Sequence, residues 1–113
     1  MLGKSTEARR LCTGPYYAKQ SENKWWCGYD YEEFVIIDDL TPQTAREQFL
    51  CLLHLCDYYV TRVCIKGATL NIRPKTIIIT STYSLIDCFG EEYGAQMAHR
   101  FNSQRTFRYH AQG

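Results

Sequence analysis

The first group of residues that could do chemistry stands at the amino terminus. Gly3, Lys4 and Ser5 have the order found in the second half of a phosphate-binding loop, and Thr6 follows them at the start of a helix-forming segment. In such a loop the lysine contacts the β- and γ-phosphates of a nucleotide and the hydroxyl ligates Mg²⁺. The tripeptide alone is more often a solvated turn than a functional site, so its meaning depends on the rest of the chain.

The second group is a pair of carboxylates, Asp38 and Asp39, which follows the apolar run of residues 34–37. In a nucleotide site of this kind the first carboxylate holds the metal and the second polarises the attacking water. A solvated acid pair in a turn between a strand and a helix is the alternative. The presence of both groups in one chain favours the functional interpretation, with ATP and Mg²⁺ as the ligands.

The elements that would position these residues alternate between helix and strand. The residue patterns predict helices over 5–12, 42–57 and 91–101, a loop over 16–31, a hairpin of strands over 59–65 and 69–72, and further strands over 33–39, 75–81 and 105–109. Two of the strands are continuous apolar runs, which suits burial on both faces of a parallel sheet. We therefore expect an α/β fold in a single domain over 1–113.

Composition excludes several other classes of protein. The 113 residues are 45% hydrophobic and 22% charged, and 13 basic against 12 acidic side chains give a net charge of +1, so contact with nucleic acid must be local. No apolar run reaches the roughly 20 residues that span a bilayer. We expect a soluble, intracellular protein without a membrane partner.

The six cysteines contain no CxxC pair and are interpreted as reduced thiols. A metal site built from Cys51, His54 and Cys56 is a less favoured alternative, because these spacings spread the three side chains over different faces of the predicted helix. Trp25 and Trp26 could stack on bases, but anchoring of the loop against the core is favoured.

The block NKWWCGYD at residues 23–30, followed by the strand that ends in the two aspartates, resembles the superfamily 3 helicase domain of circovirus-like replication-associated (Rep) proteins. Residues 77–81 resemble that family's motif C, and residues 98–101 resemble the segment that carries its arginine finger. The resemblance covers nearly the whole chain. It implies a P-loop NTPase core of the AAA+ type, with a mainly parallel sheet, helices on both faces and an inserted β-hairpin.

The resemblance also implies roles for individual residues. Lys66 and Gly67 match the tip of the family's basic hairpin, where the lysine would contact a nucleic-acid backbone and the glycine would permit the turn. Arg100 matches the arginine finger, which completes a neighbouring subunit's site in a ring. Thr82 stands where the family has an asparagine that positions the water, and its hydroxyl has a shorter reach and one fewer polar group.

A complete phosphate-binding loop needs glycine-rich residues before Gly3, and the strand that feeds the loop is central in this fold. We therefore expect a fragment, with the first strand missing and two neighbouring strands left with unpaired edges. An upstream nicking endonuclease domain belongs to proteins of this kind.

Three functions follow as expectations. The leading one is an ATP-dependent helicase domain, located in the host nucleus, that acts on single-stranded or duplex DNA, with RNA as the other substrate. The second is a catalytically silent module for nucleic-acid binding or oligomerisation. An unrelated P-loop kinase is more distant.

Overall fold

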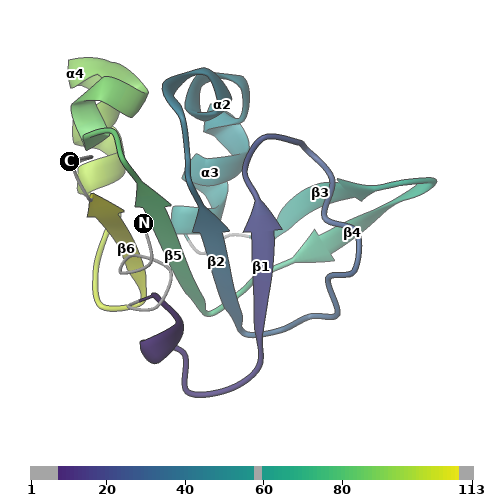
Figure 1. Cartoon of the computed structure of the whole chain (residues 1–113). Helices are drawn as coiled ribbons and strands as arrows, with labels where there is room; N and C mark the ends of the chain where they lie inside the picture. Colours follow the sequence, from purple (N-terminus) through teal and green to yellow (C-terminus); the bar gives the residue numbers. More distant parts are fainter. Residues whose placement is uncertain (1–7, 58–59, 110–113) are drawn as a thin grey trace.

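A four-stranded sheet forms the centre of the computed structural model, which describes residues 8–57 and 60–109. The strands are β1 (Tyr16–Gln20), β2 (Phe34–Asp38), β5 (Thr76–Ser81) and β6 (Arg105–Tyr109), and they lie in the order β1-β2-β5-β6. Each neighbouring pair is parallel. The carboxyl ends of all four strands therefore meet at one edge of the sheet, as Figure 1 shows.

The two central strands are buried because both of their faces are covered. Side chains alternate between the faces of a strand, and on β2 and β5 the residues Val35, Ile37, Ile77 and Ile79 point into the larger core cluster. Ile36 and Ile78 point to the opposite face, where Ala8 packs against them. This explains why the sequence of both strands is apolar without interruption.

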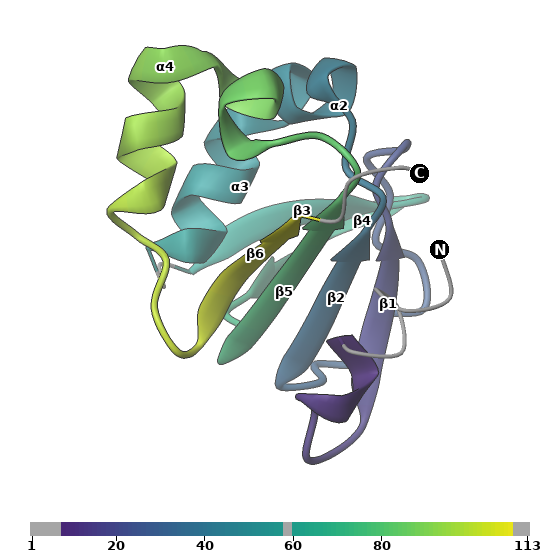
Figure 2. The ribbon, with the colours of Figure 1, turned by 60° about the vertical axis from the view of Figure 1, so that its left-hand side comes forward.

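Three helices cover the first face: α2 (Pro42–Glu47), α3 (Phe49–Cys56) and α4 (Leu85–Ala98). Figure 2 shows them on one side of the sheet, with the helical turn at residues 8–10 on the other. Thr41 caps α2 by accepting a hydrogen bond from the backbone N–H of Thr44, and Pro42 occupies the first turn, where a missing N–H costs nothing. Ser84 caps α4 in the same way.

An antiparallel hairpin of β3 (Thr61–Ile65) and β4 (Ala68–Ile72) is separate from the main sheet. It is attached through Val63 and Ile72, which are buried in the larger core cluster. The backbone N–H of Trp26 also donates a hydrogen bond of 2.8 Å to the carbonyl of Cys64. The far end of the hairpin projects past β1 (Figure 1).

The α/β class, the mainly parallel sheet and the inserted hairpin are confirmed, and the fold is consistent with a P-loop NTPase-like core. Several details of the prediction were wrong. Residues 16–31 were predicted as a loop, but they begin with β1, and the predicted helix over 42–57 is two helices that meet at the non-helical Gln48. The helix predicted over 91–101 is the second part of α4: Gly90 is non-helical, with a φ of 81°, and it follows a first part that Ser84 caps. α4 ends at Ala98, three residues before the predicted end.

The gap that we expected inside the sheet is not present among the described residues. β5 and β6 pair directly over five residues, from Ile77 opposite Arg105 to Ser81 opposite Tyr109. The interior edges of β5 and β6 are therefore satisfied by each other.

Replacing Ile79 by alanine should lower the free energy of unfolding by about 2–5 kcal/mol, because its side chain is 0% exposed and the truncation leaves a cavity in the main core. Urea denaturation measures the effect. Ile86, which is 57% exposed, is the matched control, and its alanine variant should change stability by less than about 0.5 kcal/mol. Equal losses in the two variants would contradict the described packing.

Candidate functional site

The two predicted carboxylates lie at the edge of the sheet where the parallel strands end. Asp38 is the last residue of β2, and Asp39 begins the turn into α2. Open α/β sheets bind their ligands at this edge, outside the carboxyl ends of the strands. Asp38 is half-buried and Asp39 is exposed, so the pair stands between the core and solvent.

Thr80 of β5 holds both aspartates through one hydroxyl group. Its Oγ1 donates a hydrogen bond to Oδ1 of Asp38 and accepts one of 3.1 Å from the backbone N–H of Asp39. The carbonyl of Thr80 accepts a further bond of 2.9 Å from the N–H of Leu40. Thr80 is 0% exposed, so these bonds form away from competing water.

Two serines fix the carbonyls of the same turn. Oγ of Ser21, just after β1, donates to the carbonyl of Asp39 at 3.0 Å, and Oγ of Ser81 donates to the carbonyl of Leu40 at 2.6 Å. Ser81 also accepts a bond of 2.9 Å from the N–H of Tyr83. Three hydroxyls from the ends of two strands, β1 and β5, thus hold the turn of residues 38–40, which we call the acid turn.

The backbone of the acid turn adopts a conformation that few residues accept. Asp39 has a φ of 57°, in the left-handed region. Aspartate and asparagine are enriched there among residues other than glycine. The left-handed backbone turns the chain away from β2, and the bonds from Ser21 and Thr80 hold it in place.

The acid turn offers the ligands that magnesium prefers. Asp38 and Asp39 provide carboxylate oxygens, and Mg²⁺ binds proteins through one or two carboxylates while keeping several waters. Within residues 8–57 and 60–109, no group of three or more histidine, cysteine or acidic side chains is close enough to hold a metal by itself. A magnesium ion shared with nucleotide phosphates fits this donor set; a fully protein-bound metal does not.

The other residues predicted for the nucleotide site include four near the amino terminus and Thr82. Gly3, Lys4, Ser5 and Thr6 lie outside the described residues. Thr82 is in the bend after β5, at the same edge of the sheet as the acid turn, and is half-buried.

Lys66 and Gly67 form the two-residue loop of the hairpin, as predicted. Both are exposed, and Gly67 has a φ of 90°, which a residue with a side chain rarely adopts. The loop lies at the far end of β3 and β4, away from the acid turn (Figure 1).

Arg100 lies at the opposite end of the sheet from the acid turn in the same chain. Arg100 follows α4 and precedes Gln104 by four residues. The carbonyl of Gln104 accepts a hydrogen bond from the N–H of Ile77, near the start of β5, which places this segment at the amino end of the strands. Nε of Arg100 is 2.7 Å from Oδ1 of Asp57, and its Nη1 donates to the carbonyl of Gln96 at 2.7 Å. The structure pairs Arg100 with Asp57 and not with Asp38 or Asp39 of the same chain.

Trp26 anchors the loop that leads into β2, as predicted. It is 2% exposed, its ring stacks on Tyr17 with centroids 5.7 Å apart, and it meets Tyr29 edge-on at 5.6 Å. The burial of Lys19 beside Trp26 was not predicted from the sequence. The Nζ of Lys19 donates hydrogen bonds of 2.6 Å to the carbonyls of Gln20 and Asn23. Burial lowers the pKa of Lys19, and the two carbonyls compensate for its lost hydration.

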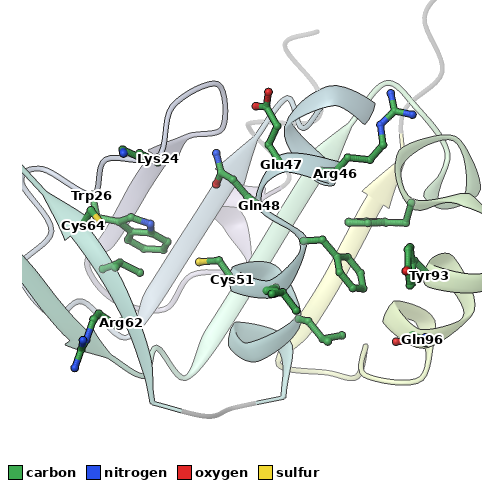
Figure 3. A pocket seen from close by; sticks show the side chains of 16 residues that line it. Lys24, Trp26, Arg46, Glu47, Gln48, Cys51, Arg62, Cys64, Tyr93 and Gln96 are labelled. Carbon is green, nitrogen blue, oxygen red and sulfur yellow. The ribbon is translucent and has the colours of Figure 1, made fainter.

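A separate cleft of about 820 Å³ lies on the helix side of the sheet, between α2, α3, α4 and the hairpin (Figure 3). Its lining is mostly apolar and includes Phe49, Val63 and Tyr93, but none of the residues of the acid turn. The cleft is therefore not part of the predicted nucleotide site.

Two cysteines of α3 have a thiol pKa that is raised by burial. Burial raises the pKa of Cys51 to about 11 and that of Cys56 to about 12. His54 is exposed while Cys56 is buried, so the alternative metal site of Cys51, His54 and Cys56 is not assembled.

Two comparisons with known proteins bear on this site. A family model described as RNA helicase matches residues 2–83. The replication-associated protein of Porcine circovirus 1 is 41% identical over 80 residues, which make up 70% of this chain and 25% of that protein.

Two further relatives have the same description. The replication-associated protein of Porcine circovirus 2 is 38% identical over 73 residues, or 65% of this chain and 22% of that protein. For Goose circovirus the identity is 34% over 98 residues, or 87% of this chain and 32% of that protein. The chain spans between a fifth and a third of the length of these relatives.

Among the described residues, no helix has both the length and the apolar character needed to cross a membrane.

The thiols should react with iodoacetamide in an order set by burial. At pH 8 a thiol with a raised pKa is almost entirely protonated and unreactive, so Cys51 and Cys56 should stay unlabelled while the exposed Cys27 is modified. Peptide mass spectrometry of the folded and urea-unfolded chain measures the order. Labelling of Cys56 as fast as Cys27 in the folded chain would contradict this environment.

Proposed function

Because the chain belongs to the family that the RNA helicase model describes, we propose that it forms the ATP-dependent helicase domain of a viral replication initiator of the Rep kind. The observation that carries the proposal is the acid turn: two adjacent carboxylates at the carboxyl edge of a parallel sheet, held by Thr80. The similar proteins named as replication-associated support the viral replication role.

In this proposal Asp38 binds the magnesium ion that accompanies ATP, and Asp39 orients and polarises the attacking water. Asp38 suits the metal role because its carboxylate is fixed by Thr80. Asp39 suits the water role because it is exposed at the edge of the sheet. Bound MgATP supplies the reactive phosphoryl group and the charge neutralisation for its transfer.

Lys4 and Ser5 would complete the site. Ala8 packs on Ile36 and Ile78, and Asp38 lies two residues beyond Ile36 on the same face. Ser5 precedes Ala8 by three residues, and three residues span at most about 10 Å. We propose that Lys4 contacts the β- and γ-phosphates, that Ser5 ligates the metal, and that Gly3 and Thr6 add backbone donors.

Thr82 would contact the water or the γ-phosphate in place of an asparagine. Its position in the bend directly after Ser81 supports this role, because that bend is next to the acid turn. The shorter side chain predicts slower hydrolysis than an asparagine variant.

Nucleic acid would be contacted at the hairpin loop. Lys66 is exposed at the tip of a hairpin that projects from the body of the protein, where its charge can pair with a phosphate irrespective of sequence. Gly67 permits the turn. DNA is the favoured substrate because the block at residues 23–30 resembles that of Rep proteins, and RNA is the other candidate.

Arg100 would act in the site of a neighbouring subunit of a homo-oligomeric ring. Its location at the opposite end of the sheet from Asp38 supports action between subunits, because its guanidinium pairs with Asp57 and lies away from Asp38 and Asp39 of its own chain. Its ion pair with Asp57 would have to rearrange on assembly, or hold the guanidinium ready for the neighbour. A location in the host nucleus follows from the same resemblance.

A catalytically silent module that binds nucleic acid is the second candidate. Thr82 in place of an asparagine is the residue that favours it. Such a module would keep the hairpin and bind single-stranded DNA with no response to nucleotide.

Replacing Asp39 by asparagine should lower ATP turnover by about 100-fold or more and leave nucleotide binding unchanged, because the charge that polarises water is lost while asparagine accepts the left-handed backbone. Asp38→Asn should instead weaken the binding of MgATP. Phosphate release and nucleotide titration distinguish the two, with the exposed Glu91→Gln as the control. If the unmodified chain shows no ATP turnover and its affinity for DNA does not change when nucleotide is added, the silent module is favoured.

Replacing Lys66 by alanine should weaken the binding of single-stranded DNA. It should also reduce the slope of log Kd against log salt concentration by about one, because one phosphate contact is lost. Fluorescence anisotropy over a salt series measures both quantities. The exposed Lys75 at the other end of the fold is the matched control. Equal effects of the two substitutions would show that the hairpin is not the contact.

A further inference from the structure

We propose that Thr80 is a positioning residue that sets the geometry of both aspartates, and that it acts through one hydroxyl group. This inference rests on the proposed nucleotide site and deepens it. Thr80 itself would touch neither the metal nor the water; it would act through Asp38 and Asp39.

The hydroxyl of Thr80 both donates and accepts a hydrogen bond. A hydroxyl has one hydrogen to donate and two lone pairs to accept with. The hydrogen is directed to Oδ1 of Asp38, and a lone pair receives the N–H of Asp39 at 3.1 Å. One atom therefore fixes the side chain of the first acid and the backbone of the second.

The bond to the N–H of Asp39 matters because that residue is in the left-handed region, with a φ of 57°. A conformation of this kind persists when surrounding contacts hold it. Thr80 holds the N–H and Ser21 holds the carbonyl, at 3.0 Å. The direction of the Asp39 carboxylate depends on this backbone, so the loss of the Thr80 hydroxyl should release it.

The register of the sheet explains why Thr80 has this position. β2 and β5 are parallel, and Ile36 pairs with Ile78 and Ile37 with Ile79. The next pair in this register is Asp38 and Thr80. Their side chains lie on the same face of two strands that are about 4.8 Å apart, and they are hydrogen-bonded to each other. Threonine is stiff at χ1, and the side chain is 0% exposed, so its hydroxyl has little freedom to turn away.

The test compares the whole chain with three variants. Thr80→Val keeps the shape but removes the hydroxyl, and Thr80→Ser keeps the hydroxyl. Thr76→Val is the matched control, because Thr76 is a buried threonine at the other end of the same strand whose hydroxyl bonds to Gln104. Any general cost of removing a buried hydroxyl from β5 appears in this control.

Two measurements are made on each protein. The first is the affinity for Mn²⁺ in the presence of ATP, followed by electron paramagnetic resonance. The second, made without nucleotide, is the hydrogen exchange rate of the Asp39 amide, followed by nuclear magnetic resonance. The Leu40 amide, which donates to the carbonyl of Thr80, is the internal reference because no Thr80 side-chain substitution removes that acceptor.

Thr80→Val should weaken Mn²⁺ binding by about tenfold or more, the usual size for the loss of a group that orients a metal ligand. It should also speed exchange of the Asp39 amide much more than that of the Leu40 amide. Thr80→Ser should restore both quantities to within a few-fold, and Thr76→Val should leave both unchanged. Unchanged Mn²⁺ affinity in Thr80→Val, or an equal loss in Thr76→Val, would overturn the inference.

The result also distinguishes this inference from the proposed function. If the unmodified chain shows no Mn²⁺ binding with ATP, the proposed nucleotide site fails for this chain. The exchange measurement then decides the inference alone: selective exposure of the Asp39 amide in Thr80→Val supports the positioning role, and retained protection overturns it.

Discussion

The attachment of the acid turn to β5 is the constraint on which the rest of the site depends. A carboxylate at the end of a strand is useful for binding a metal only if it is held in one place. Thr80 holds Asp38 by its carboxylate and Asp39 by its amide, and both contacts join residues about 40 positions apart in the chain. The site therefore exists only when β2 and β5 pair in the observed register.

The same register explains the packing of the fold. Alternate residues of β2 and β5 face the three helices, and those between them face Ala8. Asp38 and Thr80 continue the second set. A slip of one residue would turn Asp38 toward the helices and take Ile37 out of the larger core cluster, so the hydrophobic core itself enforces the geometry of the acids.

The sequence was sufficient for the parts that depend on local pattern. The apolar runs of β2 and β5, the turn at Lys66 and Gly67, and the two acids at the end of a strand were all predicted, because each is visible within a few residues. β1 was missed because its alternation includes Lys19, whose burial depends on carbonyls that only the folded loop brings near. Thr80 was missed because no local pattern reveals a hydrogen bond across two strands.

The most direct test of the central claim is a crystal structure of the chain with Mg²⁺ and a non-hydrolysable ATP analogue. We expect a magnesium ion about 2.1 Å from a carboxylate oxygen of Asp38, with the γ-phosphate beside Asp39. Nucleotide bound elsewhere, for example in the apolar cleft beside Phe49 and Tyr93, with no metal at Asp38, would contradict it.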